Sequence, residues 1–251
     1  MSRSSVDQTA VAIVTGGAQR IGAAIVHALH ESGMNIVIHY RSSGHHAHSL
    51  KRELDNLRPN SVMLSQGDLC DHQIIENLTS QTIKHFGRLD LLVNNASNFY
   101  TTPIKTASTD DFDDLMGVNL KAPLFLSKSA APFLKQTNGA IINITDIYAE
   151  RPLKDYAIYC AAKAALASLT RSLARELAPN IRVNAIAPGA ILWPEDDSVR
   201  LQQQNQIISR TPLASIGKVQ DIQNAVLYLT NSANFVTGQI LRIDGGRSVT
   251  P

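Results

Sequence analysis

The 251-residue chain has little cysteine, few aromatic residues and little net charge. Its two cysteines, Cys70 and Cys160, are too few for a disulfide scaffold, so a reducing compartment is the simpler expectation. A net charge of +2, with histidine neutral, gives no electrostatic reason to expect an anionic partner. We therefore expect neither nucleic acid nor a membrane among the partners.

Long apolar runs are also missing. No run approaches the ~20 residues that a bilayer-spanning helix needs. Residues 1–10 form a polar N-terminal tail without the apolar centre and cleavage site of a signal peptide. The composition predicts a soluble, cytoplasmic protein, with 44% hydrophobic residues to build a sizeable core.

Short apolar runs of strand length alternate with segments whose apolar residues recur at helical spacing. The expected strands are 11–15, 34–40, 61–66, 89–93, 140–145, 181–187 and 240–244. No linker, repeat or low-complexity tract interrupts this alternation. It predicts a single α/β domain over residues 11–251, with a seven-stranded parallel sheet flanked by helices in the doubly wound, Rossmann arrangement.

Two regions depart from the simple alternation. Residues 110–134 have a helical pattern that is interrupted at Pro123 and contains Asn119. Asn119 is either a satisfied polar core residue or part of a proton or water relay. Residues 190–210 are less regular and contain Trp193. Their place between the sixth strand and the final helix is typical of a substrate lid.

A glycine-rich turn follows the first expected strand. Gly16 and Gly22 flank Arg20, and Ile21 begins the apolar pattern of a helix. Such a turn places backbone N–H groups and the positive end of the helix dipole beside a phosphate, although an ordinary strand-to-helix turn also uses glycine. The usual dinucleotide pattern has glycine where this chain has Arg20. The arginine would add a fixed cation beside the phosphates.

The end of the second expected strand bears on the choice of cofactor. Tyr40 is followed by Arg41 and Ser42, with no carboxylate. In doubly wound domains a carboxylate here favours a free ribose 2′-hydroxyl, whereas an arginine accommodates a 2′-phosphate. This pattern predicts NADPH rather than NADH. A solvated loop arginine is the alternative.

The histidines at 45, 46 and 48 superficially resemble a metal-binding tract. They lack the cysteine or carboxylate partners of a recognisable site and fall at an expected exposed helix start. We predict no metal ligand among them.

Small and polar residues follow three further strands, where ligands bind in open α/β sheets. These are Asp68 and Leu69 after the third strand, Asn95, Ala96 and Ser97 after the fourth, and Pro188 and Gly189 after the sixth. Phe99 and Tyr100 lie in the loop beyond the fourth strand. A loop aromatic is usually a packing residue, but its position over the expected crevice makes ring stacking a competing interpretation.

The stretch from Asn143 to Lys163 holds the candidate catalytic residues. Tyr159 precedes Lys163 by four residues, which in a helix places an ammonium where it can stabilise a phenolate. Isolated pairs of this kind are more often a half-buried tyrosine and a surface lysine. Asp146 ends the fifth strand thirteen residues before Tyr159. Its alternative role is to cap a turn.

With these motifs in order, and with Asp-Gly-Gly at 244–246, the chain resembles the short-chain dehydrogenase/reductase family over essentially its full length. More narrowly it is similar to the pteridine reductases, including the bacterial dihydromonapterin reductases. Three departures from the general family pattern support the narrower resemblance. Arg20 replaces the middle glycine, Asp146 replaces the usual serine, and Ser97 is followed by Phe99 and Tyr100.

The resemblance implies an enzyme that uses NADPH to reduce the C=N bond of a dihydropterin, or of a folate, to the tetrahydro form. Tyr159 would donate or relay a proton, and Lys163 would lower the pKa of Tyr159 and bind the nicotinamide ribose. Asp146 would hydrogen-bond Tyr159, and Phe99 would stack on the pterin. The implied cofactor contacts are Gly16, Arg20, Ile21, Gly22, Tyr40, Arg41, Ser42, Asp68, Leu69, Asn95, Ala96, Ser97, Asn119, Pro188 and Gly189. The implied substrate contacts are Arg20, Ser97, Phe99, Tyr159 and Trp193.

The identity of residue 146 bears on the bond that is reduced. Reducing a carbonyl develops alkoxide charge, which an ionised aspartate would repel, whereas reducing a ring C=N bond requires a proton on nitrogen, which a carboxyl group can relay. Asp146 therefore favours a ring imine. The alternatives are a carbonyl or 3-oxoacyl reductase of the same family and a non-catalytic NADPH-binding sensor. The resemblance also implies a homotetramer with a place in folate metabolism.

Overall fold

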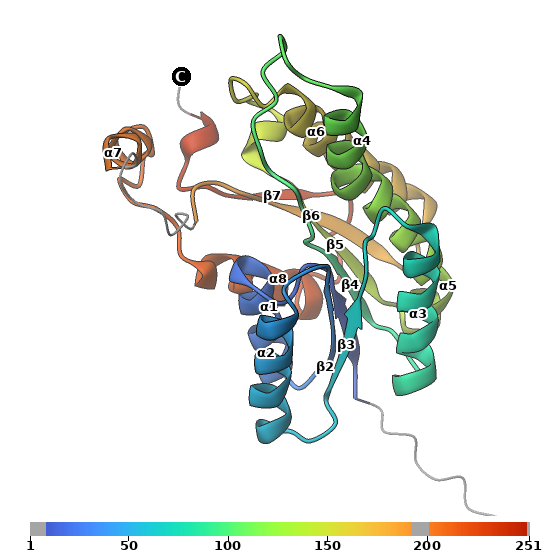
Figure 1. The fold of residues 1–251 in the computed structure, drawn as a ribbon. Coiled ribbons are helices and arrows are strands. Elements are labelled where there is room, and N and C mark those ends of the chain that lie inside the picture. Colours follow the sequence, from blue (N-terminus) through green and yellow to red (C-terminus); the bar gives the residue numbers. More distant parts are fainter. Residues whose placement is uncertain (1–8, 192–200, 250–251) are drawn as a thin grey trace, which may run out of the picture.

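The computed structural model describes residues 9–191 and 201–249. Within them, seven strands form one parallel sheet in the order β3-β2-β1-β4-β5-β6-β7 (Figure 1). The strands are β1 (Val11–Val14), β2 (Asn35–Tyr40), β3 (Val62–Gln66), β4 (Leu91–Asn94), β5 (Ala140–Ile144), β6 (Arg182–Pro188) and β7 (Ile240–Ile243). The predicted doubly wound α/β fold is confirmed.

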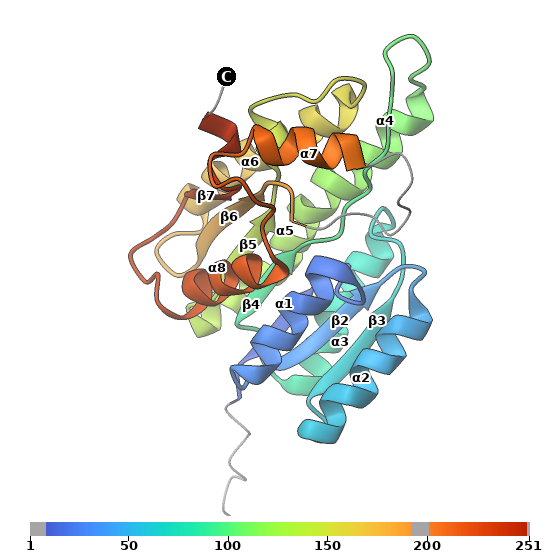
Figure 2. The ribbon, with the colours of Figure 1, turned by 90° about the vertical axis from the view of Figure 1, so that its left-hand side faces the viewer.

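Helices cover both faces of the sheet (Figures 1 and 2). One face carries α1 (Arg20–Glu31), α2 (Gly44–Leu57) and α8 (Val219–Asn231), and the other carries α3 (His72–Phe86), α4 (Thr109–Met116), α5 (Ala122–Thr137) and α6 (Ala157–Glu176). A further helix, α7 (Leu201–Ser209), lies outside both layers (Figure 2). Among the described helices, none is both long and apolar enough to cross a membrane.

Alternate residues of the central strands supply two hydrophobic cores. In β1, Ala12 and Val14 pack with residues of α1, α2 and α8, whereas Val11 and Ile13 pack with residues of α3, α5 and α6. All four side chains have 0% exposure. Strands that are buried on both faces are apolar at every position, which is why each appeared in the sequence as a continuous apolar run.

The strand order reverses at β1, which pairs with β2 on one side and with β4 on the other. Helices that follow these two strands leave in opposite directions, so a crevice forms beyond their carboxyl ends. The glycine turn after β1 and the loop after β4 meet there. The fold therefore brings the predicted site segments to one edge of the sheet.

Two segments differ from the sequence prediction. The helical segment at 110–134 does not break at Pro123. Instead α4 continues through a π-helical turn, η1 (Gly117–Lys121), into α5, and Pro123 occupies the first turn of α5. The wider π-helical turn interrupts the α-helical hydrogen-bond pattern one turn earlier than expected. The region 190–210 was predicted to be irregular, but it contains α7. The expected tail at 1–8 and Trp193 lie outside the described residues.

Close packing of α1 on the glycine turn gives a stability prediction. A Cβ on Gly22 would lie 2.1 Å from the Gly16 carbonyl oxygen and 2.7 Å from Asn95 Nδ2. We expect Gly22→Ala to lower the free energy of unfolding, measured in urea without cofactor, by about 2 kcal/mol, because overpacking typically costs about 1–3 kcal/mol. The control is Gly44→Ala in α2, whose Cβ would meet only Tyr40 Cε2, at 3.6 Å. A loss of stability as large for the control would contradict the steric explanation.

Candidate active site

The glycine turn is fastened to the end of β4. Thr15 Oγ1 accepts hydrogen bonds from the backbone N–H groups of Asn95 and Ala96, both at 2.9 Å. In return, Asn95 Nδ2 donates to the carbonyl oxygens of Thr15 and Gly16, at 2.9 and 3.1 Å. The amide donors of Asn95 thus position the turn. Thr15 was not among the predicted site residues, although a hydroxyl at the end of an apolar strand is the signal that would have found it.

His39 fastens the same turn to the end of β3. Its Nδ1 accepts the Gly16 N–H at 3.4 Å, its Nε2 lies 3.1 Å from the Gly67 carbonyl oxygen, and its own carbonyl accepts the Gly17 N–H at 2.9 Å. A backbone donor on one ring nitrogen and an acceptor on the other require a neutral imidazole. Burial lowers the pKa of His39 to about 4, in agreement with this state. The sequence analysis missed His39, an imidazole in a strand that is otherwise largely apolar.

Arg20 adopts a backbone conformation that favours glycine, with φ of 53°. This explains why glycine is usual at this position. No side chain caps the first N–H groups of α1, and its first turn contains no acidic residue. Uncapped N–H groups at a helix N-terminus can bind a phosphate. The turn, with the exposed Arg20 side chain beside it, therefore fits the pyrophosphate of a dinucleotide.

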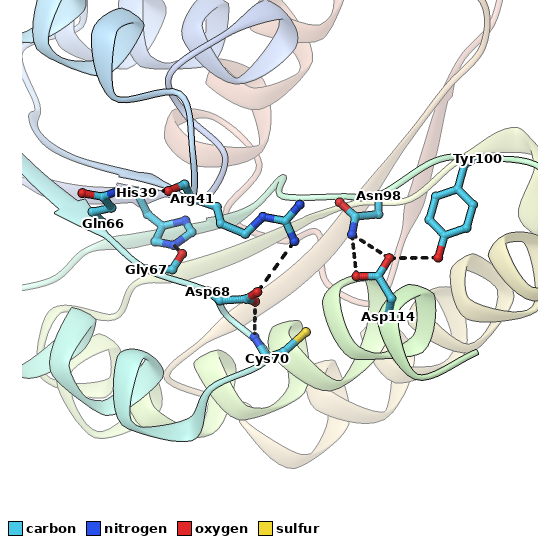
Figure 3. Close-up of polar contacts among 9 residues, drawn as sticks. All are labelled: His39, Arg41, Gln66, Gly67, Asp68, Cys70, Asn98, Tyr100 and Asp114. Atoms are coloured by element: carbon cyan, nitrogen blue, oxygen red, sulfur yellow. Dashed lines mark hydrogen bonds and ion pairs between the residues drawn. The ribbon is translucent and has the colours of Figure 1, made fainter. Parts of the chain in front are cut away.

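Arg41 lies beyond β2, next to Asp68 from the end of β3 (Figure 3). Arg41 Nη1 is 3.7 Å from Asp68 Oδ2, and the two side chains are 52% and 49% exposed. The Asp68 carboxylate also accepts the Cys70 N–H at 2.9 Å. An ion pair this exposed contributes only about 0–1 kcal/mol, so another anion can replace Asp68 beside Arg41 at low cost.

Other predicted cofactor residues lie along the same edge. Tyr40 and Leu69 are buried, whereas Ser42 is exposed. At the end of β6, Pro188 is buried and Gly189 packs so closely on Asp244 that a Cβ would lie 2.8 Å from the Asp244 Cα. Their roles in cofactor binding stay predictions.

The histidines at 45, 46 and 48 are exposed at the start of α2, as predicted. The Nδ1 of His46 is 2.9 Å from Gln19 Nε2. Across the part of the chain that the structure describes, no three His, Cys, Asp or Glu side chains are grouped so that they could hold a metal ion.

Asp146 has two partners. Its Oδ1 accepts the Tyr148 N–H at 2.9 Å, which caps the short 3-10 helix η2 (Ile147–Ala149), and its Oδ2 accepts the Tyr159 hydroxyl at 2.7 Å. Turn capping and contact with Tyr159 were separate interpretations of the sequence. The carboxylate does both.

Lys163 lies on the same face of α6 as Tyr159, with its Nζ 5.7 Å from the centre of the tyrosine ring. The side chain is only 2% exposed, and Nζ donates to the Ile144 carbonyl oxygen at 3.0 Å. The interpretation of Lys163 as a surface lysine is therefore wrong. Burial lowers its pKa to about 8, an effect that the negative charge of Asp146 partly offsets.

The pKa of Tyr159 differs from the sequence expectation. It is raised, first by burial and then by the charge and hydrogen bond of Asp146, rather than lowered by Lys163. The lysine ammonium faces a backbone carbonyl and the tyrosine hydroxyl faces a carboxylate, so the phenol keeps its proton. Burial also raises the pKa of Asp146, partly offset by the Tyr148 N–H, the Tyr159 hydroxyl and Lys163. Asp146 therefore takes up a proton more readily than an exposed aspartate.

Polar groups continue from Tyr159 towards α4. The Ser97 hydroxyl hydrogen-bonds Tyr159 and donates to Asn119 Oδ1 at 2.6 Å. Asn119 is fully buried in η1, and its Nδ2 donates to the carbonyl oxygens of Asn98, at 3.1 Å, and Leu115, at 3.0 Å. Asn119 is thus a satisfied core residue that is also joined through Ser97 to Tyr159.

Phe99 is 52% exposed beside the catalytic candidates. Its ring stacks on Tyr156, with centroids 4.5 Å apart and planes at 16°, and meets Tyr159 edge-on at 4.8 Å. An exposed aromatic face next to a buried hydroxyl can bind a flat ring. Tyr156 was not predicted as a site residue, although it precedes Tyr159 by three residues at the start of α6.

A parallel sheet of this order, a turn that fits a dinucleotide pyrophosphate and a tyrosine–lysine pair at the carboxyl edge define a nucleotide-dependent oxidoreductase. The sequence model of the family described as Enoyl-(Acyl carrier protein) reductase matches residues 16–248. The chain belongs to the short-chain dehydrogenase/reductase family.

Three curated relatives show the range within this family. The chain is 34% identical to pteridine reductase 1 of Leishmania tarentolae, over 96% of each chain. It is 33% identical to the 3-oxoacyl-acyl-carrier-protein reductase FabG of Staphylococcus aureus, over 95% of this chain and 98% of the relative. It is 34% identical to an uncharacterized oxidoreductase of Mycobacterium tuberculosis, over 94% of this chain and 91% of the relative. Overall identity does not separate the pterin enzyme from the oxoacyl enzyme.

The buried lysine gives a prediction for stability against pH. From about pH 8 to 10.5, an unfolded chain keeps the Lys163 proton that the folded protein has lost, so the stability of the folded protein rises with pH. Measured by urea unfolding, the stability of the wild type relative to Lys163→Met should increase by about 3 kcal/mol over this range. Lys128→Met, on the exposed face of α5, should show no such trend. Parallel curves for wild type and Lys163→Met would contradict the lowered pKa.

Proposed function

We propose that the chain is an NADPH-dependent pteridine reductase that converts a dihydropterin to a tetrahydropterin by reducing a C=N bond. The observation that carries this proposal is the Asp146 carboxylate, which accepts the Tyr159 hydroxyl at 2.7 Å. Two relatives of nearly equal identity act on different substrates, as their names state. The choice between them therefore depends on the chemistry of the site.

The position of Asp146 suits protonation of nitrogen better than stabilisation of an oxyanion. A ketone that accepts hydride develops negative charge on oxygen, and a carboxylate beside Tyr159 would repel that charge. An imine that accepts hydride at carbon needs one proton at nitrogen. Tyr159 can donate this proton and recover one from Asp146, whose pKa is raised by burial.

The other residues have supporting roles in this reaction. When bound, NADPH supplies the hydride. Lys163 holds a positive charge at the base of the site and would contact the nicotinamide ribose. Phe99 would stack on the pterin and so orient the C=N bond towards Tyr159. Ser97 and Arg20 would bridge the cofactor phosphates and the substrate.

The surroundings of Arg41 support NADPH as the cofactor. Its guanidinium lies beyond the end of β2, where the adenosine ribose is expected, and its present partner Asp68 is half exposed. A ribose 2′-phosphate would replace a weak ion pair by charge-assisted hydrogen bonds. Asp68 alone would repel a 2′-phosphate, so selectivity depends on the arginine.

The proposal predicts the outcome of a substrate panel. NADPH oxidation should be measured with dihydromonapterin, dihydrobiopterin, dihydrofolate and a set of ketones that includes a 3-oxoacyl thioester. We expect turnover of at least one pterin or folate and little turnover of ketones. Rapid ketone reduction without pterin reduction would favour a carbonyl or 3-oxoacyl reductase. Absence of any turnover by a protein that binds NADPH would favour a non-catalytic sensor.

Replacing Asp146 tests the proton relay directly. Asp146→Ser keeps a group that can cap the turn but removes the carboxyl proton carrier. We expect kcat/KM for the dihydropterin to fall by about 100-fold or more, since general acid–base groups contribute about 10²–10⁴-fold. Ketone reduction by this variant should be kept or increased. An unchanged rate with the pterin would exclude Asp146 from the relay.

Replacing Arg41 tests the choice of cofactor. Arg41→Asp should raise the dissociation constant of NADPH by about tenfold or more, because hydrogen bonds to charged groups contribute about 1.5–3 kcal/mol. Binding of NADH should change little, as measured by nicotinamide fluorescence. Arg52→Asp, the same charge change at an exposed position of α2, is the control. An unaltered ratio of the two affinities in Arg41→Asp would rule out contact with the 2′-phosphate.

A further inference from the structure

Phe99 lies between two residues that bind the same carboxylate on α4. Asn98 Nδ2 donates to both oxygens of Asp114, each at 2.9 Å, and the Tyr100 hydroxyl donates to Asp114 Oδ2 at 3.0 Å (Figure 3). We call residues 98–100 the Phe99 arch. We propose that Asp114 is a positioning residue that fixes this arch, and with it the ring of Phe99, for stacking against the substrate. The inference rests on the proposed pterin reduction, which gives Phe99 a flat ring to bind.

The arch is also held at a second point. The Asn98 carbonyl oxygen accepts a hydrogen bond from Asn119 Nδ2 at 3.1 Å, so the side chain and the backbone of Asn98 are both bound to the α4–η1 segment. The rest of the segment from Asn95 to Pro103 has no helix or strand structure of its own. Without these bonds, ordering the arch would cost about 1–2 kcal/mol for each residue that is fixed.

Asp114 is itself attached to a fixed element. The N-terminus of α4 is closed by a capping box between Ser108 and Asp111. Near its other end, the fully buried Leu115 packs in a cluster with Tyr159 and Cys160 of α6. The helix that carries Asp114 therefore contacts the catalytic tyrosine directly. Asp114 transmits the position of α6 to the arch.

The orientation of Phe99 follows from these contacts. Its ring stacks on Tyr156 and meets the ring of Tyr159 edge-on at 4.8 Å, yet 52% of the side chain is exposed. A substrate ring bound on this aromatic surface would have its reacting nitrogen placed relative to the Tyr159 hydroxyl. A displacement of about 1 Å at a reacting centre can cost about 100-fold in rate, so a fixed arch has a direct catalytic consequence.

The second donor to Asp114 stays protonated. Burial, together with the hydrogen bond and charge of Asp114, raises the pKa of Tyr100 to about 12. The Tyr100 hydroxyl therefore donates throughout the neutral pH range. Asn98 cannot titrate at all, so both donors that hold the arch persist under ordinary assay conditions.

Asp114→Asn is the main test, because it keeps the shape of the side chain but replaces one acceptor oxygen by a donor. We expect KM for the dihydropterin to rise about tenfold, equivalent to ~1.4 kcal/mol, with kcat within about twofold and NADPH affinity unchanged. Tyr100→Phe removes only one of the bonds and should give a smaller change of the same kind. The control is Asp113→Asn, the same substitution at the exposed neighbouring position.

A double-mutant cycle separates positioning from general structural support. If Asp114 acts through Phe99, Asp114→Asn should have no further effect on KM in a Phe99→Ala background. Additive effects, or a parallel loss of NADPH affinity and thermal stability, would overturn the proposal.

The resonance of ¹⁹F-labelled Phe99, assigned with Phe99→Leu, provides a readout without substrate. Asp114→Asn should shift or broaden this signal, and Asp113→Asn should not. A shifted signal in a protein that does not reduce pterins would support the positioning and overturn the pteridine assignment. Pterin turnover with an unchanged signal and an unchanged KM would overturn the positioning alone.

Discussion

Thr15, Asn95 and Asp146 follow the carboxyl ends of three neighbouring strands, β1, β4 and β5, and the parallel pairing of these strands brings the three residues to one edge of the sheet. Parallel pairing is the constraint on which the site depends. It requires helical crossovers on both faces, which bury the strands and make them rigid. The turn and the catalytic loop can then be joined by single hydrogen bonds, because the strands that carry them are already aligned.

The catalytic group is stabilised by mutual compensation of buried charge. Lys163 is 2% exposed and Tyr159 is 4% exposed, so neither could readily carry a charge alone in this environment. The Asp146 carboxylate is satisfied by a backbone N–H and the tyrosine hydroxyl, while the Lys163 ammonium is satisfied by a backbone carbonyl. Each group shifts the pKa of another, so the proton is shared by the three residues rather than owned by one. This arrangement suits a relay better than an isolated acid.

The sequence was informative wherever a local pattern has one physical cause. Strands buried on both faces must be apolar throughout, and for that reason all seven were found with ends within two residues of those in the structure. Tyr159 and Lys163 were placed together by helical spacing alone. Contacts between distant segments have no such pattern. Asp114 lies in a run of acidic residues that is typical of a solvated helix face, and its bonds to Asn98 and Tyr100 exist only once α4 packs beside the β4 loop. The raised pKa of Tyr159 escaped prediction for the same reason, since burial decides its direction.

The two bonds of Asp146 suggest how one fold supports two chemistries. The bond to the Tyr148 N–H fixes the turn after β5, and a serine hydroxyl, usual at this position in the family, can accept a similar bond. The bond to Tyr159 determines whether the neighbouring group donates to an oxyanion or relays a proton. A single exchange of serine and aspartate therefore changes the reaction without disturbing the turn. This separation is consistent with the nearly equal identity of the chain to a pterin reductase and to an oxoacyl reductase, because most of the sequence maintains the shared sheet and cofactor turn, and few positions select the bond that is reduced.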